Sequence, residues 1–299
     1  MFTPRSPHLK AVLQALFVTF LWSTSWVLIK IGLEDIPALT FAGLRYSLAF
    51  LILLPFALRK GQMAVLRGLS RRDWLWLSAL GILFYSITQG AQFLALTSLP
   101  AVTLSLLLNF SAVVVAFMGI VLLSEYLSRL QWIGTGLFLV GVVLYFYPIA
   151  IPAGEGLGLI IGFIGVLANA GSAVLGRYVN RGQRLPALTV TLVSMGVGAT
   201  LLMITGLITQ GLPTLSLTSW LIILWLAAVN TALAFTLWNV TLRTLPAVES
   251  SIINNTMLVQ IAILAWLFLD ETIAPLEGFG LVLAAIGILM VQIRRQSSE

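Results

Sequence analysis

Apolar residues run through the chain in long stretches, which charged residues, prolines and glycines interrupt at regular intervals. A transmembrane helix needs about 20 mainly apolar residues to cross the hydrocarbon core of a bilayer. Divided at its charges, prolines and glycines, the sequence contains ten stretches of this kind. They are residues 11–32, 37–58, 74–96, 100–122, 130–147, 157–177, 186–208, 219–241, 247–269 and 274–293. The pattern predicts an all-α membrane protein of ten transmembrane helices.

Proline marks the start of several stretches, at Pro37, Pro100, Pro186 and Pro246. In the first turn of a helix the missing N–H is not needed and the fixed φ suits the helix. We interpret these prolines as boundaries rather than kinks. The first stretch is followed by further apolar stretches, with no small-residue cleavage pattern after it, so we expect a retained helix rather than a removed signal.

The composition supports this interpretation and limits the possible functions. Hydrophobic residues make up 60% of the chain and charged residues 9%, too apolar a balance for a surface that faces water. The connections are too short for a soluble catalytic domain. The absence of cysteine excludes disulfides, thiolate metal sites and cysteine nucleophiles. The single histidine is His8, and no acidic residue lies near the middle of a stretch. We therefore expect no enzyme, no cofactor and no metal site.

Basic residues gather on alternate loops. Because lysine and arginine in short loops stay in the cytoplasm, their distribution predicts the orientation. One set of loops holds fourteen of the sixteen basic residues: Arg5, Lys10, Arg59, Lys60, Arg67, Arg71, Arg72, Arg129, Arg177, Arg181, Arg184, Arg243, Arg294 and Arg295. We predict a protein of the cytoplasmic (inner) membrane with both termini cytoplasmic. The net charge of +6 is spread over loops and not over one basic face, so we expect no nucleic acid as a partner.

The second half of the sequence repeats the first. A shift of 146 positions aligns residues 96–125 with 242–271 without a gap, including the LPAV of 99–102 and 245–248, and places Gly134 on Gly280 and Gly141 on Gly287. The sequence therefore predicts two five-helix repeats, residues 1–148 and 149–299. An odd number of helices makes the second repeat enter from the opposite side, and the basic loop 59–72 indeed corresponds to residues 210–218, which carry no base.

An inverted repeat is typical of transporters in which two halves expose a central site alternately to each side. A duplication that serves stability alone is the alternative. Polar side chains inside apolar helices favour a pathway, because they are costly in lipid unless they face the bundle interior or water. The candidates for a cavity wall are Thr24, Tyr85, Gln89, Asn109, Asn169, Ser172, Asn254 and Asn255. Tyr85, Gln89 and Gln92 have the spacing of one α-helical face. Each amide alone would also suit an interhelical hydrogen bond of about 0.6 to 2 kcal/mol.

The chain resembles the EamA type of the drug/metabolite transporter superfamily. The resemblance rests on LWSTSWVLIKIGLEDIPALTFAGLRYSLAFLILLP at 21–55, the LPAV starts of helices four and nine, the SE and DE after them, and glycine-rich fifth and tenth helices. It is similar in layout to bacterial amino-acid and metabolite exporters of the YddG group. The resemblance implies ten helices, a central cavity and export of small metabolites. It places Tyr85, Asn109, Phe110, Asn169 and Ser172 at that cavity; Ala112 and Asn169 stand where such exporters carry Trp, which indicates a smaller or more polar pocket.

Several further residues are candidates for gates, walls or packing. Trp22, Trp26 and Trp238 supply apolar walls, gates or ordinary core aromatics, and Pro100 and Pro246 begin the repeated helices. Arg45 is the one cation expected inside a helix. It binds a substrate carboxylate, or it pairs with carbonyls of a neighbouring helix or with an acidic residue at a helix end. We expect Lys30 and Arg177 to extend toward the interface.

These features predict a secondary transporter that exports small metabolites by alternating access, with aromatic or other neutral amino acids as the first candidates. Other metabolites or drugs such as purines or sugars are the alternative solutes, and a channel is the alternative mechanism. The expected partners are a small-molecule substrate and the lipid bilayer, with the protein as a monomer or a homodimer.

Overall fold

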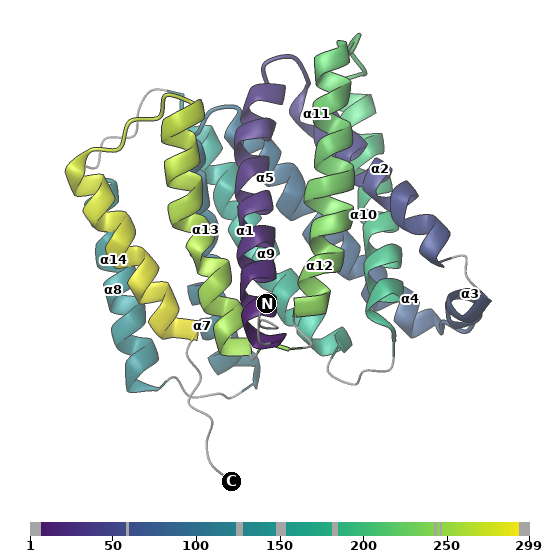
Figure 1. Cartoon of the computed structure of the whole chain (residues 1–299), viewed down its shortest axis with the longest axis horizontal. Coiled ribbons are helices and arrows are strands. Elements are labelled where there is room, and N and C mark those ends of the chain that lie inside the picture. The colour runs from purple at the N-terminus through teal and green to yellow at the C-terminus, as the bar shows by residue number, and fades with distance from the viewer. Residues whose placement is uncertain are drawn as a thin grey trace, which may run out of the picture. The chain divides into compact units, whose positions relative to one another are not determined.

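The computed structural model describes residues 7–57, 60–123, 128–147, 154–180, 185–241, 244–245 and 247–292, and this part of the chain is helical with no strand (Figure 1). The elements are α1 (Pro7–Gly32), α2 (Ala38–Ala57), α3 (Lys60–Arg67), α4 (Arg71–Gly81), η1 (Ile82–Thr88), α5 (Gln89–Leu96), α6 (Ala101–Asn109), α7 (Ser111–Leu123), α8 (Arg129–Tyr145), α9 (Gly156–Asn180), α10 (Ala187–Thr209), α11 (Leu217–Ala227), η2 (Ala228–Leu233), α12 (Ala234–Thr241), α13 (Ala247–Phe268) and α14 (Pro275–Gln292).

The all-α membrane class predicted from the sequence is confirmed. Among the described residues, seven helical stretches are long and apolar enough to cross a bilayer. They are His8–Gly32, Ala38–Phe56, Arg71–Leu96, Ala101–Met118, Gly156–Gly176, Ala187–Thr209 and Leu217–Trp238. Three shorter apolar helices follow the remaining predicted stretches, at Arg129–Tyr145, Ile252–Phe268 and Pro275–Val291.

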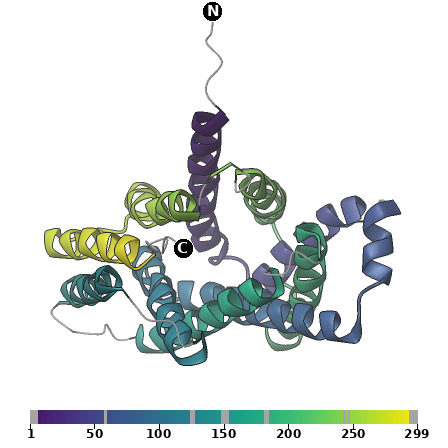
Figure 2. The ribbon, with the colours of Figure 1, turned by 90° about the horizontal axis from the view of Figure 1, so that it is seen from below.

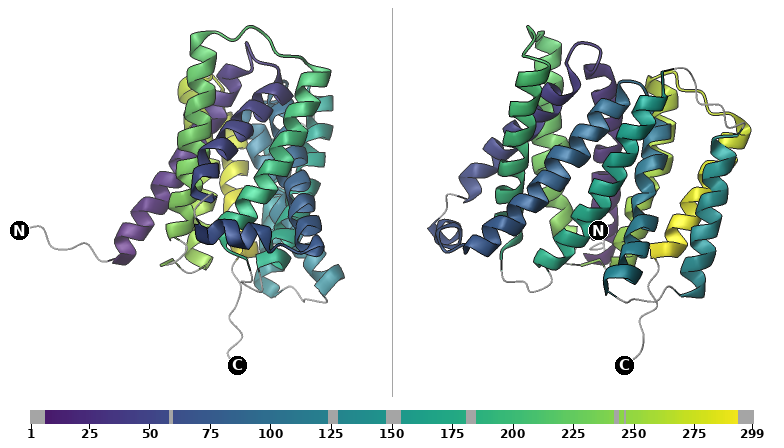
Figure 3. Two further views of the ribbon diagram at one scale, coloured as in Figure 1. Left: turned by 90° about the vertical axis from the view of Figure 1, so that its right-hand side faces the viewer. Right: turned by 180° about the vertical axis from the view of Figure 1, so that it is seen from behind.

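The basic loop after α2 contains a helix that the hydrophobic pattern did not predict. Residues Lys60–Arg67 form α3, a short helix between α2 and α4 (Figure 3). The next helix, α4, begins with a capping box: Asp73 donates its N–H to the Ser70 hydroxyl, and the Asp73 carboxylate accepts the Ser70 N–H. These two bonds satisfy N–H groups that have no partner inside the helix, and so they fix where α4 begins.

The fourth predicted helix, 100–122, is interrupted at Phe110. The Asn109 side chain donates to the carbonyl of Ser105 at 2.8 Å, and the Phe110 N–H bonds to the carbonyl of Leu107, three residues back, at 3.0 Å. A side chain that bonds back into its own helix competes with the backbone ladder and bends the helix. The predicted span is present as Ala101–Met118, with a local irregularity at Phe110 that the hydrophobic pattern did not predict and next to which Asn109 lies.

Two predicted helices contain a π-helical segment in their middle. The segments are η1 in the third predicted helix and η2 in the eighth, and their first residues, Ile82 and Ala228, are 146 positions apart. In each, a threonine hydroxyl bonds a carbonyl five residues back, Thr88 to Leu83 and Thr231 to Leu226, both at 2.8 Å. π-helical turns are rare and frequent at functional sites, so the two repeats share an unusual feature at the same position.

The chain divides into two compact units, and each takes helices from both halves of the sequence. The first unit comprises Met1–Val27, Pro100–Ala153 and Leu233–Glu299. The second comprises Leu28–Leu99 and Gly154–Ala232.

In the first unit, α8 and α14 pack closely along their lengths, and Figure 2 shows them side by side. A Cβ at Gly134 would lie 2.7 Å from the carbonyl oxygen of Gly287, and one at Gly141 would lie 2.6 Å from that of Gly280. Residue numbers therefore rise along α8 as they fall along α14, so the helices are antiparallel. In the repeat, Gly134 corresponds to Gly280 and Gly141 to Gly287. Gly134 therefore faces the counterpart of Gly141, and Gly141 faces the counterpart of Gly134.

In the second unit, α2 and α10 pack against each other in the same manner. A Cβ at Gly43 would lie 2.6 Å from the Cα of Met203, and one at Gly206 would lie 2.6 Å from the backbone nitrogen of Thr40. These two helices are also antiparallel. They correspond to helices two and seven of the sequence repeat, so both units are built on a pair of equivalent helices.

Candidate functional site

The second unit buries a charged side chain inside an apolar helix. Arg45 on α2 is 5% exposed. Its Nε donates to the Thr231 hydroxyl at 3.1 Å, and its guanidinium carbon lies 5.1 Å from the centre of the Tyr46 ring. A guanidinium at this distance is attracted to the ring face. One hydrogen bond and one aromatic ring therefore hold the position of the cation.

Tyr46 connects Arg45 to two more polar side chains. Its hydroxyl donates to Oε1 of Gln89 at 2.6 Å, and its ring meets the Tyr85 ring edge to face at 5.5 Å. Tyr46 and Tyr85 are each 4% exposed, whereas Gln89 is half-buried. We call Arg45, Tyr46, Tyr85, Gln89 and Thr231 the arginine cluster.

The π-helical segments supply two members of the arginine cluster from equivalent positions. Tyr85 lies in η1 and Thr231 in η2, 146 residues later. Tyr85 and Gln89 both approach Tyr46, as one shared face requires. The α-helical spacing from which that face was predicted does not hold through residue 85, because residues 82–88 are π-helical.

The other predicted residues of the second unit lie on α9. Ser172 is 5% exposed, and its hydroxyl donates to the carbonyl of Asn169 at 2.8 Å. Asn169 is half-buried. Helix α9 packs against η1 and α5, so these side chains belong to the helix that covers the elements bearing Tyr85 and Gln89.

In the first unit, a polar network joins α1 to α13 around Gln260. Its Oε1 accepts the Ser23 hydroxyl at 2.9 Å, and its Nε2 donates to the hydroxyls of Thr19 at 3.2 Å and Thr256 at 2.9 Å. Both ends of the amide are satisfied. This network is an interhelical hydrogen-bonded contact, and it leaves no group of Gln260 directed at a solute.

Two predicted tryptophans of the first unit meet in one aromatic group. Trp22 on α1 lies 5.2 Å from Trp238 and 5.3 Å from Phe235, both on α12. Trp26 is buried, and the hydroxyl of the half-buried Thr24 bonds the carbonyl of Leu21 at 2.7 Å. These contacts place Trp22 and Trp238 in an apolar aromatic group, and their role as walls or gates stays a prediction.

The repeated asparagines are placed differently in the two repeats. Asn109 is half-buried at the interruption of helix four, next to Phe110, whose ring lies 5.7 Å from that of Phe138. Asn255 is buried and Asn254 half-buried on α13, which continues without a break. Pro100 stands directly before α6. Pro246 lies outside the described residues.

The start of α6 is held by an acidic side chain. Glu271 follows α13, and its two carboxylate oxygens accept the N–H of Ala101 at 2.7 Å and of Val102 at 3.2 Å. A carboxylate at a helix N-terminus satisfies N–H groups that lack a partner inside the helix and is favoured by the helix dipole. The DE that follows helix nine therefore acts on the LPAV that begins helix four.

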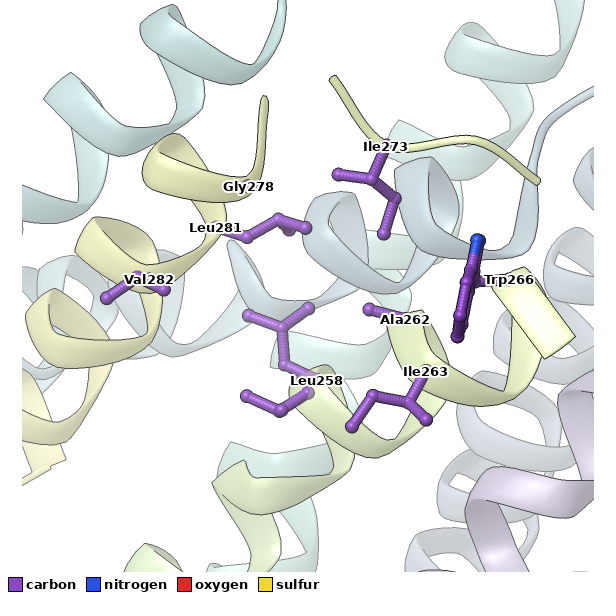
Figure 4. Close-up of a pocket in the computed structure, with 9 residues that line it drawn as sticks. Leu258, Ala262, Ile263, Trp266, Ile273, Gly278, Leu281 and Val282 are labelled. Carbon is purple, nitrogen blue, oxygen red and sulfur yellow. The ribbon is translucent and has the colours of Figure 1, made fainter. Parts of the chain in front are cut away.

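A cavity of about 260 Å³ lies between α13 and α14 (Figure 4). The side chains that line it are apolar apart from the indole nitrogen of Trp266, and include Leu258, Ala262, Leu281 and Val282. Such a lining suits hydrocarbon and offers no set of polar groups to orient a polar solute. The polar candidate residues lie elsewhere, so we do not assign the solute site to this cavity.

Two further differences from the sequence-based expectations concern charged and aromatic side chains. The Nζ of Lys30 donates to the carbonyls of Leu96 and Leu99, both at 2.7 Å, a contact that the sequence did not predict. Carbonyls at the end of a helix lack intrahelical partners and attract a cation. Tyr46 was missed, although a tyrosine directly after an arginine within an apolar stretch was a visible signal. The side chain of Arg177 lies outside what the structure describes.

The chain is similar to membrane transporters along most of its length. The model of the EamA-like transporter family matches residues 9–147 and again 156–293. A probable amino-acid metabolite efflux pump of Salmonella typhimurium is 28% identical over 287 residues, which cover 92% of each chain. Its namesake in Escherichia coli K12 is 26% identical over 287 residues, with the same 92% coverage.

Other relatives match over shorter lengths. An uncharacterized transporter of Bacillus subtilis is 28% identical over 212 residues, and the match spans 65% of that relative's length. An uncharacterized transporter of Archaeoglobus fulgidus is 36% identical over 101 residues, which cover 34% of each chain. A crystal structure of a protein with 17% identity has a TM-score of 0.64 and covers 94% of this chain and 97% of its own. At that identity the likeness shows the fold alone.

Proposed function

We propose a specific export function for this chain, which belongs to the EamA-like transporter family. It is a multi-pass membrane transporter, and we propose that it exports amino acids or closely related small metabolites across the cytoplasmic membrane. Two relatives that match over 92% of each chain are named as probable amino-acid metabolite efflux pumps. The half-buried and buried polar side chains of both units support a polar solute rather than a hydrocarbon one.

The mechanism in this proposal is alternating access by two inverted five-helix repeats with ten membrane spans. The three shorter apolar helices, α8, α13 and α14, would then also cross. The observation that carries this proposal is the antiparallel contact of equivalent helices, α8 with α14 and α2 with α10. Two copies related by an axis in the membrane plane bring equivalent helices together in opposite directions, whereas an axis along the membrane normal would make them parallel.

Cysteine labelling tests the inverted arrangement. Because the chain has no cysteine, the single variants Ala64→Cys on α3 and Thr214→Cys before α11, both exposed positions, can be labelled without background. We expect a membrane-impermeant maleimide to reach Ala64→Cys only from the cytoplasmic side and Thr214→Cys only from the opposite side. Labelling of both from one side would mean parallel repeats and would contradict the mechanism.

Flux measurements test the transport function itself. The full chain in proteoliposomes is expected to show counterflow of at least one neutral amino acid from a panel that also contains adenine and glucose. Counterflow of adenine or glucose alone would contradict amino acids as the substrate class and indicate a purine or a sugar instead. Single-channel currents without counterflow would contradict alternating access and indicate a channel.

Variants of the predicted cavity residues should reduce flux more than they reduce folded yield. We expect Tyr85→Ala, Asn109→Ala and Asn255→Ala each to lower counterflow roughly tenfold. A change of this size corresponds to the loss of about one hydrogen bond between uncharged groups of the protein and the solute. Thr209→Ala is the control: the Thr209 hydroxyl bonds only the carbonyl of Thr205 at an exposed position. Flux at the wild-type rate in all three cavity variants would contradict this assignment.

A further inference from the structure

We propose that the arginine cluster binds the carboxylate group of the exported solute, so that a carboxylate is the feature by which the solute is recognised. This inference rests on the proposed export function and assigns the substrate class to one place in it. The solutes it selects are small molecules with a free carboxylate, amino acids among them. Purines, sugars and simple amines are not in this class.

Arg45 is a buried cation whose hydrogen-bond donors are only partly paired in the described residues. Guanidinium has five N–H donors, and in the described residues Arg45 uses only its Nε–H, toward Thr231. No carboxylate of the described chain lies within ion-pair distance of Arg45, which is 5% exposed. A buried charge is costly unless it is paired and hydrogen-bonded. The four N–H donors of the terminal guanidinium nitrogens are therefore available to an anion.

The other free groups of the cluster can also donate hydrogen bonds. The Tyr46 hydroxyl donates to Oε1 of Gln89, which uses the acceptor of that amide and leaves its NH₂ group. The Tyr85 hydroxyl has no hydrogen-bond partner in the part of the chain that the structure describes. Guanidinium, NH₂ and hydroxyl groups together match a ligand that only accepts. A carboxylate takes two parallel N–H bonds from one guanidinium.

The charge of the cluster also limits the charge of the ligand. One guanidinium balances one negative charge, and no second cation belongs to the cluster. A doubly charged phosphate ester would keep an uncompensated charge in a buried site, which is costly. A single carboxylate leaves the site neutral, so the geometry and the charge select the same group.

The fold itself does not need a cation at this position. When Pro37 is aligned with Pro186, Arg45 falls on Ser194 of α10. Ser194 satisfies itself with a hydroxyl bond to the carbonyl of Val190 at 2.6 Å. Equivalent helices of the two repeats thus pack with an arginine in one and a small hydroxyl in the other, which points to a ligand rather than to packing as the reason for Arg45.

The test is a binding measurement on the full chain in lipid nanodiscs, with three neutral amino acids (L-phenylalanine, L-leucine and L-alanine), their carboxamides, adenine and glucose as probes. Bound ligand is read from the rise in the thermal unfolding midpoint with ligand concentration. We expect at least one amino acid to bind, and its carboxamide to bind about 10- to 100-fold more weakly, since charge-assisted bonds are lost. Equal binding of acid and amide, or binding of adenine or glucose alone, would overturn the inference, as would no binding by any of the three acids.

Substitutions locate the effect. Arg45→Gln should reduce the difference between acid and amide to less than about threefold, and Arg45→Lys should restore part of it, because lysine keeps the charge without the two-pronged geometry. Arg72→Gln is the matched control, an arginine of the same unit that also contacts a tyrosine, Tyr178, but at an exposed position. It should keep the full difference. An unchanged difference between acid and amide in Arg45→Gln would overturn the inference. If that variant does not fold, the same difference is measured in Gln89→Leu, which lacks the NH₂ donor and should bind the acid less selectively than the wild type does. An unchanged difference in Gln89→Leu would then overturn the inference.

Counterflow separates this inference from the export function. A bound amino acid that shows no counterflow would refute export and leave the carboxylate site standing. Counterflow of adenine or glucose with no carboxylate binding would refute the carboxylate site and leave export standing.

Discussion

Gly141→Ala is expected to prevent close packing of α8 on α14 and to lower the free energy of unfolding by about 2 to 3 kcal/mol. The added Cβ would lie 2.5 Å from the backbone nitrogen of Ala284 and 2.6 Å from the carbonyl oxygen of Gly280. Both atoms belong to the backbone of a helix, so neither can rotate away as a flexible side chain would. The two helices must separate or shift. Folded yield and the thermal unfolding midpoint in detergent measure the effect.

Gly136→Ala is the control on the same helix. Gly136 is exposed and a Cβ there meets nothing within 4 Å. Since alanine is the better helix former by about 1 kcal/mol, this variant should be neutral or slightly more stable. The two substitutions are chemically identical and differ only in what faces them. If both variants unfold at the same midpoint, the α8–α14 contact does not support the fold as described.

The length of the apolar stretches predicted the helical class, because a bilayer demands a minimum length of apolar helix. The alignment of the sequence with itself at a shift of 146 residues predicted the repeat. Gly134, Gly141, Gly280 and Gly287 were visible as aligned pairs. Their physical reason was not, since close contact between α8 and α14 is a property of the folded chain. Glycine at a helix contact lets two backbones approach, and only the structure shows which helices these glycines bring together.

Local irregularities were beyond the reach of the pattern. The π-helical turns of η1 and η2 and the interruption at Phe110 lie within uniformly apolar stretches. Hydrophobic periodicity assumes a constant number of residues per turn, and it cannot register an extra residue or a hydrogen bond that runs three residues back. Asn109 was singled out as a possible solute contact, and its bond to the carbonyl of Ser105 gives it a role in the helix as well.

The candidate site was predicted in part. Arg45, Tyr85 and Gln89 were each chosen as polar residues in apolar helices, and the structure joins them through Tyr46. Tyr85 was chosen because it shares a helical spacing with Gln89 and Gln92, whereas Tyr46 was omitted because no such spacing connected it to another candidate. The hydrogen bond between Thr231 and Arg45 could not be predicted, since it joins two residues that are 186 positions apart in sequence and meet only in the folded chain.

Glu271→Ala is expected to loosen the start of α6 and to lower the free energy of unfolding by about 2 kcal/mol, the usual size of hydrogen bonds to a charged group. The chain turns at Asp270, whose φ is +53°, and the carboxylate of the next residue then binds the N–H groups of Ala101 and Val102. These bonds join residues about 170 positions apart in sequence. Glu271→Gln keeps one acceptor oxygen and loses the charge, so its effect should be about half as large.

Glu277→Ala is the matched control for Glu271→Ala, because it removes a cap that is local instead of one that joins distant segments. The Glu277 carboxylate accepts the N–H of Ala274, three residues earlier, at 2.8 Å and at an exposed position. Exposed caps of this kind contribute about 0.5 to 1 kcal/mol. Glu271→Ala should therefore lower the unfolding midpoint clearly more than Glu277→Ala, and equal shifts would mean that the bonds to α6 add nothing beyond an ordinary cap. This difference is expected because Pro100 has no side chain that can cap the first turn of α6. The Glu271 carboxylate binds the N–H groups of that turn and so fixes the end of helix nine to the start of helix four.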